Sequence, residues 1–177
     1  MEEPSDPDLI SRPQDENKAA FESLLGPVIE SAARLAYAML QDRAEAEDVV
    51  QEAAVSAWRK LGNLRAGTEF KPWFMGIVAN QCRSVRRRAG WSVVRVEKPP
   101  RGDRPGPEDV AVRSTDLRRA LNTLSPDLRV ALLLHFYLDL PLEEVSVALG
   151  ISVPGVKSRI NRALKQMRPS LSGEAYV

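Results

Sequence analysis

The chain has 177 residues, of which 44% are hydrophobic and 28% charged, and its formal net charge is +1. This composition is typical of a soluble globular chain with one domain or two small ones, and it excludes a chain that is disordered throughout. The single cysteine, Cys82, excludes an internal disulfide and a multi-cysteine zinc site, and the single histidine, His135, gives it no partner for a metal site or a catalytic dyad. We therefore expect no metal and no cofactor.

Residues 1–16 contain six acidic residues and one arginine, which predicts an acidic flexible tail. This start lacks the basic and apolar regions of a signal peptide, and no apolar run reaches the ~20 residues that cross a bilayer. We therefore expect a cytoplasmic protein.

Residues 17–90 show helical periodicity and form the first predicted domain. Apolar residues spaced along one helical face begin this stretch: Phe21, Leu24, Leu25, Val28, Leu35 and Met39. In the next helix, over residues 45–61, a small apolar face lies opposite a polar one that carries Asp48, Gln51, Glu52, Val55 and Arg59. This polar face would repel DNA. It suits either a protein partner or a solvated first turn, where acidic residues favour the helix dipole, and spacing alone weighs the two equally.

The stretch "FKPWFMGIVANQCRSVRRR", residues 70–88, predicts a helix with an aromatic start and a basic end. Phe70, Phe74, Ile77 and Val78 are its expected core. The residues left for other surfaces are Trp73, Asn80, Arg83, Arg86, Arg87 and Arg88. Aromatic and arginine side chains together bind unstacked bases and a phosphate backbone. A packed Trp73 and a solubilising arginine cluster are the alternative.

Residues 91–112 interrupt the helical pattern with prolines and glycines, which predicts an interdomain linker. Val93, Val94 and Val96 are also compatible with a short strand or with an extended segment bound in a partner's groove. No stretch alternates convincingly at period two. The expected fold is therefore all-α, with two small helical domains joined by this linker.

Residues 113–172 form the second predicted domain, which ends in a helix-turn-helix. A short helix over Leu142–Leu149 is followed by a turn at Gly150 and by a longer helix that Ser152 caps. On the longer helix we expect a buried face of Val156, Ile160, Ala163, Leu164 and Met167. The exposed face and its flank, which lack carboxylates, consist of Lys157, Ser158, Arg159, Asn161, Arg162, Lys165 and Arg168. Such a helix fits a major groove, although basic residues near a helix C-terminus also suit its dipole.

Three stretches in this order, "AEDVVQEAAVSAW", "FKPWFMGIVANQCRSVRRR" and "LSPDLRVALLLHFYLDLPLEEVSVALGISVPGVKSRINRAL", resemble the bacterial RNA polymerase sigma factors of the extracytoplasmic-function class. The resemblance covers about residues 18–90 and 113–170. It implies a sigma region 2 domain over 17–90 and a sigma region 4 domain over 113–172, and a linker that runs through the polymerase's RNA exit path.

The resemblance also implies roles for the residues. Core RNA polymerase would bind, through the clamp helices of its largest subunit, a face made of Asp48, Gln51, Glu52 and Arg59. The minus-ten element of promoter DNA would contact residues 63–71, Trp73, Asn80, Arg83, Arg86, Arg87 and Arg88. The minus-thirty-five element would contact Lys157, Ser158, Arg159, Asn161, Arg162 and Lys165. An anti-sigma partner is usual in the class, and no small-molecule substrate is implied.

The sequence departs from the family pattern at Ser84, where an acid is common, and at Gly76 and Cys82, where longer side chains are usual. In addition, Pro154 and Gly155 leave few side chains near the start of the recognition helix. The expected function is that of an alternative sigma factor without catalytic activity. An autonomous helix-turn-helix regulator is the first alternative, and a helical enzyme whose basic patches bind an anionic substrate is the second.

Overall fold

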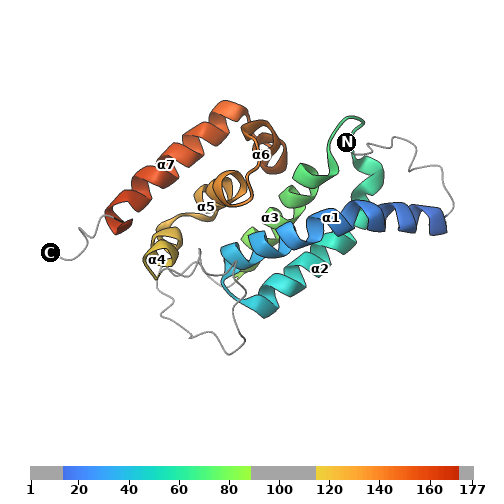
Figure 1. Cartoon of the computed structure of the whole chain (residues 1–177), viewed down its shortest axis with the longest axis horizontal. Coiled ribbons are helices and arrows are strands. Elements are labelled where there is room, and N and C mark those ends of the chain that lie inside the picture. The colour runs from blue at the N-terminus through green and yellow to red at the C-terminus, as the bar shows by residue number, and fades with distance from the viewer. Residues whose placement is uncertain (1–13, 89–114, 172–177) are drawn as a thin grey trace.

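The computed structural model describes residues 14–88 and 115–171, and every regular element in these ranges is helical (Figure 1). The helices are α1 (Gln14–Leu40), α2 (Arg43–Lys60), α3 (Phe70–Arg88), α4 (Thr115–Thr123), α5 (Pro126–Leu132), α6 (Leu142–Leu149) and α7 (Val153–Leu171), with a 3₁₀ turn η1 (Leu61–Asn63) and a π-helical turn η3 (Leu133–Tyr137). The all-α prediction is confirmed. The expected linker and its alternative strand lie outside the described residues.

Helices α1, α2 and α3 pack on one another and form what we call the N-terminal unit. The expected apolar face of α2 is buried in full: Ala46, Val49, Val50, Ala53 and Ala57. Asp42 caps this helix, because its side chain accepts a hydrogen bond of 2.9 Å from the backbone N–H of Glu45. Helix α1 begins at Gln14, so the last three residues of the predicted acidic tail are helical.

Helices α4 to α7 form the C-terminal unit, in which α7 packs on α4, α5 and α6. The turn between α6 and α7 has the predicted form. Gly150 adopts a left-handed conformation with φ 63°, and the Ser152 hydroxyl accepts a hydrogen bond from the Gly155 N–H at 3.3 Å. Val156, Ile160, Ala163 and Met167 are buried, as expected, but Leu164 is 43% exposed. The prediction of Leu164 as a core residue is wrong.

The two units share one continuous hydrophobic core. Helix α3 packs against α6, and α1 contacts α5 and η3, so the second half of the chain packs directly on the first (Figure 1). A Cβ atom on Gly76 of α3 would lie 3.2 Å from the Cα and carbonyl carbon of Ala148 in α6, and closer still to its carbonyl oxygen. Only glycine permits this approach of the two backbones. Gly76, a departure from the family pattern in the sequence, therefore has a packing reason.

Candidate nucleic-acid interface

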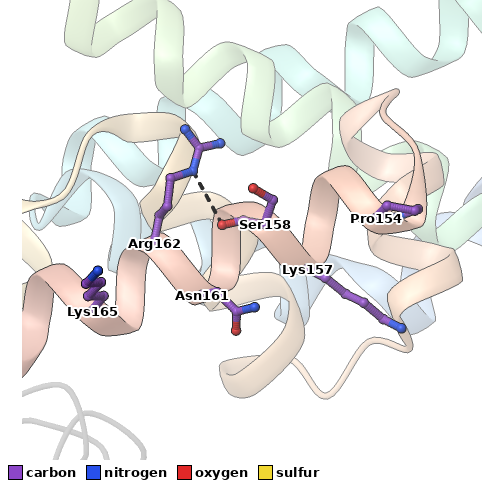
Figure 2. A pocket seen from close by; sticks show the side chains of 6 residues that line it. All are labelled: Pro154, Lys157, Ser158, Asn161, Arg162 and Lys165. Carbon is purple, nitrogen blue, oxygen red and sulfur yellow. Dashed lines mark hydrogen bonds between the residues drawn. The ribbon is translucent and has the colours of Figure 1, made fainter.

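Helix α7 presents one continuous polar face. A surface hollow along this face is lined by Pro154, Lys157, Ser158, Asn161, Arg162 and Lys165 (Figure 2). The side chains of Lys157, Asn161 and Lys165 extend from the helix without bonding to one another in this view. Arg162 lies back along the helix, where its Nε donates to the backbone carbonyl oxygen of Ser158 at 3.4 Å. The other five lining residues are predicted DNA contacts, and all five are exposed on one face of the helix: Lys157, Ser158, Asn161, Arg162 and Lys165.

Arg159 differs from the other predicted contacts of α7, because it lies on the flank toward α5. Its Nη1 is 4.0 Å from Oδ1 of Asp127 in the first turn of α5, and its side chain is only 22% exposed. The structure therefore separates Arg159 from the exposed face.

The basic end of α3 is divided between two environments. Arg87 and Arg88 are exposed, whereas Arg83 and Arg86 are partly buried. Arg83 donates through Nη1 to Oδ1 of Asp127 at 2.6 Å, and through Nη2 to the side-chain oxygen of Asn80. The bond to Asp127 joins the N-terminal unit to the C-terminal unit.

Arg86 caps the C-terminal end of α1. Its guanidinium donates to the carbonyl oxygen of Met39 at 2.7 Å and to that of Leu40 at 3.3 Å. Carbonyl groups in the last turn of a helix lack partners within the helix, and a cation there also complements the helix dipole. Arg86 therefore has a structural function within the N-terminal unit.

The predicted minus-ten segment, residues 63–71, includes a turn before α3, and its last two residues belong to α3, where Phe70 is buried. The Thr68 N–H donates to the Arg65 carbonyl oxygen at 3.0 Å, and Gly67 has φ +82°. Trp73, on the first turn of α3, is partly buried with its ring centroid 5.7 Å from that of Phe70. Trp73 thus belongs in part to the aromatic cluster of the core.

The polar face of α2 is open to solvent. Asp48, Gln51, Glu52 and Arg59 are all exposed. Val55 on the same face is 49% exposed, and the neighbouring Trp58 is 40% exposed. The open face of α2 therefore combines carboxylates with two partly exposed apolar side chains.

Asp127 was missed as a functional candidate from the sequence. It follows Ser125 and Pro126 in the first turn of a helix, where an acid is expected for capping and dipole reasons alone. No local pattern could indicate that it lies beside both Arg83 and Arg159, because these residues come from helices that are distant in sequence.

Two buried groups have shifted pKa values. Burial raises the pKa of the Cys82 thiol to about 12, against an opposing effect of the nearby Arg86 charge. Burial, together with repulsion from Arg86, lowers the pKa of the Arg129 guanidinium to about 10. Within the described ranges, no cluster of three or more histidine, cysteine or acidic side chains could hold a metal ion. Helices long and apolar enough to cross a membrane are likewise not found among the described residues.

Two family models match the chain. The sigma-70 region 2 model matches residues 22–92, and the sigma-70 region 4 model matches residues 114–167. Among curated proteins, an RNA polymerase sigma factor of Mycolicibacterium smegmatis, the ECF factor SigE, is 33% identical over 148 residues, covering 78% of this chain and 56% of that protein. The sigma factor SigV of Bacillus subtilis is 31% identical over 141 residues, covering 80% of this chain and 84% of SigV.

Two solved structures have a similar fold. One is the sigma factor RpoE of Bartonella quintana in complex with the anti-sigma factor NepR, with a TM-score of 0.69 and 26% identity, covering 86% of this chain and 97% of RpoE. The other is CnrH in complex with the cytosolic domain of CnrY, with a TM-score of 0.69 and 22% identity, covering 91% of this chain and 93% of CnrH. Both matches extend across the N-terminal and C-terminal units.

Proposed function

We propose that this chain, which belongs to the sigma-70 family of RNA polymerase sigma factors and to its extracytoplasmic-function class, binds core RNA polymerase and directs it to promoters. The observation that carries the proposal is the separation of charge between helices. The open face of α2 bears Asp48 and Glu52, while the end of α3 and the face of α7 are basic. One chain thus offers a surface for a protein partner and two surfaces for a polyanion.

The polymerase-binding surface is the face of α2 that carries Asp48, Gln51, Glu52 and Arg59. Its exposed Val55 and Trp58 supply apolar area that a docked helix could bury. We assign these residues to the clamp helices of the largest polymerase subunit, as the family resemblance implies. Because the charges on this face repel phosphates, it stays available to protein when the rest of the chain contacts DNA.

The DNA-binding surfaces lie on α3 and α7. The helix-turn-helix of α6 and α7 would place α7 in the major groove at the minus-thirty-five element, with Lys157, Asn161 and Arg162 directed at base edges and phosphates. The loop before α3, with Trp73, Asn80, Arg83, Arg87 and Arg88, would bind the separated strands of the minus-ten element. Flipping a base costs a few kcal/mol, which stacking and phosphate contacts offset.

We assign residues 17–90 to sigma region 2, which binds the minus-ten element. We assign residues 113–172 to sigma region 4, which binds the minus-thirty-five element. Each DNA contact is weak alone, and the polymerase combines them by holding both on one platform. The chain itself catalyses no reaction and acts in the cytoplasm with the polymerase. The sigma factor RpoE of Bartonella quintana was crystallised with an anti-sigma factor, which supports an anti-sigma factor as a further partner of this chain.

The test is transcription in vitro with bacterial core polymerase, the protein and a genomic fragment library. New start sites that depend on the protein and share two upstream motifs at fixed spacing are the expected result. An autonomous helix-turn-helix regulator would instead shift duplex DNA in a gel without polymerase and would add no start sites. Turnover of a nucleotide substrate would favour the enzyme alternative.

A further inference from the structure

Helix α7 is held against the C-terminal unit by apolar contacts along one side. The residues of this side belong to the hydrophobic core, and the helix contacts α4, α5 and α6: Val156, Ile160, Ala163 and Met167. Apolar contacts are non-directional, so they determine which face is buried but do not fix how the helix tilts or slides. Hydrogen bonds have preferred lengths and directions. The polar bonds of α7 to its neighbours can therefore fix the orientation that apolar packing leaves free.

The first of these bonds closes the turn before α7. The Ser146 hydroxyl in α6 donates to the carbonyl oxygen of Ile151 at 2.6 Å, and the Ile151 N–H donates to the carbonyl oxygen of Ser146 at 3.2 Å. The same two residues are thus bonded twice, across the left-handed Gly150. The backbone bond is usual where a helix ends in a left-handed residue. The side-chain bond is additional to that turn, and it requires a donor group at position 146.

The second bond lies toward the other end of α7. The side-chain amide of Gln166 donates through Nε2 to the carbonyl oxygen of Thr123 at 2.8 Å. Thr123 is the last residue of α4, and carbonyl groups in the last turn of a helix lack partners within that helix. The bond therefore supplies a partner to the end of α4, and it fixes the spacing of α4 and α7 at this point.

Neither Ser146 nor Gln166 lines the face of α7 that we assign to DNA. The hollow along that face is lined by Pro154, Lys157, Ser158, Asn161, Arg162 and Lys165 (Figure 2). Ser146 belongs to the preceding helix and is partly buried, with its hydroxyl bound at the turn. The amide nitrogen of Gln166 is directed to α4. Both residues are therefore placed to affect DNA binding through the orientation of α7.

A small tilt at the turn becomes a large displacement along the exposed face. Lys165 lies about 21 Å along the helix from Ile151 at ~1.5 Å per residue, so a tilt of about 5° moves it by roughly 2 Å. A hydrogen bond to a base edge is lost over that distance, because donor and acceptor must stay within about 3.2 Å of each other. A phosphate contact is affected less, since the lysine side chain is flexible and charge attraction declines gradually with distance. Orientation therefore matters more for sequence discrimination than for binding to DNA of any sequence.

We propose that Ser146 and Gln166 are positioning residues, which hold α7 in the orientation that lets its exposed face distinguish one base sequence from another. This inference rests on the proposed function, because it concerns how that face would read the minus-thirty-five element. Ser146 holds the start of α7, and Gln166 holds it near its end. Without either bond the helix stays packed on its apolar side but can tilt. Phosphates are then still bound, and discrimination between sequences falls.

The test measures promoter binding by the holoenzyme formed from core polymerase and the full chain. One promoter that the chain activates in vitro is compared with versions in which the minus-thirty-five element is replaced entirely or at single base pairs. Discrimination is the ratio of the dissociation constants for the replaced and the original promoter. A variant that partly unfolds, or that loses a phosphate contact, binds both promoters more weakly by the same factor, and its ratio is unchanged. A side chain that contacts one base directly affects discrimination at that base pair alone.

Three variants separate the two donor groups from side-chain size. Ser146→Ala removes the hydroxyl, Ser146→Thr keeps it, and Gln166→Met keeps the side-chain length without the donor. Ser23→Ala is the matched control, because the Ser23 hydroxyl also donates to a carbonyl oxygen, that of Ala20 at 2.7 Å, but within α1.

We expect Ser146→Ala and Gln166→Met each to reduce discrimination against the fully replaced element roughly tenfold, as loss of one well-aligned base contact would. The loss should extend over several base pairs, and the slope of log affinity against log salt concentration should stay the same. Ser146→Thr and Ser23→Ala should discriminate as the unsubstituted chain does.

Unchanged discrimination in Ser146→Ala and Gln166→Met would overturn the proposal. An equal loss in Ser146→Thr would overturn it too, because the hydroxyl would then not be the cause. A loss confined to one base pair would indicate direct contact with a base, which also contradicts a positioning role. If neither the unsubstituted chain nor Ser23→Ala binds any promoter with core polymerase, the proposed function itself is rejected.

Discussion

The guanidinium of Arg129 in α5 donates to the carbonyl oxygen of Met39 in α1 at 3.1 Å, across 90 positions of sequence. Arg129 is the one charged residue buried among those the structure describes. The same carbonyl oxygen also accepts from Arg86 of α3 at 2.7 Å. Two cations from different units thus meet at the end of one helix, where the helix dipole is negative.

Arg129 provides a test of what its burial contributes. We expect Arg129→Ala to lower the free energy of unfolding by about 2–4 kcal/mol, because it leaves a cavity in the core. Arg129→Met should cost under about 1 kcal/mol, because it fills the space without a buried charge and Arg86 still caps Met39. Urea denaturation measures both. Equal losses would show that the hydrogen bond, and not the filled volume, stabilises the fold.

Reversing the charge of the α2 face should prevent polymerase binding. The double variant Asp48→Lys with Glu52→Lys should lose binding to core polymerase by at least about tenfold, because the face then repels a partner of complementary charge. Its circular-dichroism spectrum should not change, since both side chains are exposed. Glu30→Lys on α1 is the control and should bind normally. Binding retained by the double variant would remove this surface from the proposal.

The basic face of α7 should determine the salt dependence of promoter binding. With the holoenzyme formed on core polymerase, we expect Arg162→Ala to reduce the slope of log affinity against log salt concentration by about one. Lys18→Ala, at an exposed lysine of α1, should leave the slope unchanged. The slope is obtained from promoter binding at several salt concentrations. If Arg162→Ala and Lys18→Ala give the same slope, Arg162 does not contact phosphate.

The buried thiol of Cys82 should make the fold sensitive to alkali. Its pKa is raised to about 12 in the folded chain from an ordinary value of 9.0, so the folded state keeps a proton that the unfolded state has lost. This contribution to stability is complete below pH 9 and declines as the pH rises toward 12, by at most about 1.4 kcal/mol per pH unit. Urea denaturation of Cys82→Ala should show a smaller decline over that range. An identical decline would assign the alkaline loss to other groups.

Any side chain at Gly150, in the left-handed turn between α6 and α7, should lower the free energy of unfolding. Gly150→Ala meets no neighbouring atom, so its effect is the backbone strain of φ 63° alone. We expect a loss of about 1–2 kcal/mol in the free energy of unfolding, measured with urea. Gly62→Ala, also in open space but without a positive φ, is the control. A loss as small as that of the control would mean that the turn relaxes.

Helical periodicity and local capping were sufficient to predict most of the fold. The face of α2 follows directly from the spacing of Ala46, Val49, Val50 and Ala53, and the turn at Gly150 follows from a glycine before a capping serine. A helical wheel places Leu164 beside Met167 and so predicts it in the core, yet its side chain is 43% exposed. A helical wheel shows which residues share a face of one helix, but it does not show which faces the neighbouring helices cover.

The candidate site could be predicted by residue type and less well by position. Lys157, Asn161 and Lys165 lie on the open face because their spacing fixes their direction. The partners of Arg83, Arg86 and Arg159 could not be predicted, since Asp127 and the Met39 carbonyl reach them through packing of helices distant in sequence. Gly76 departs from the family pattern, and the sequence alone gives no reason for this glycine. The reason is its close contact with the backbone of Ala148 in the other unit.

The cap that Arg86 places on α1 has a consequence for the order in which the chain is synthesised. Its partners, Met39 and Leu40, precede it, so all three are made before any residue of α4 leaves the ribosome. The nascent N-terminal unit can therefore satisfy the end of α1 with its own arginine and fold while translation continues. Arg129 arrives later, at a carbonyl that already has one partner. Capping of α1 in the N-terminal unit therefore does not depend on synthesis of the C-terminal unit.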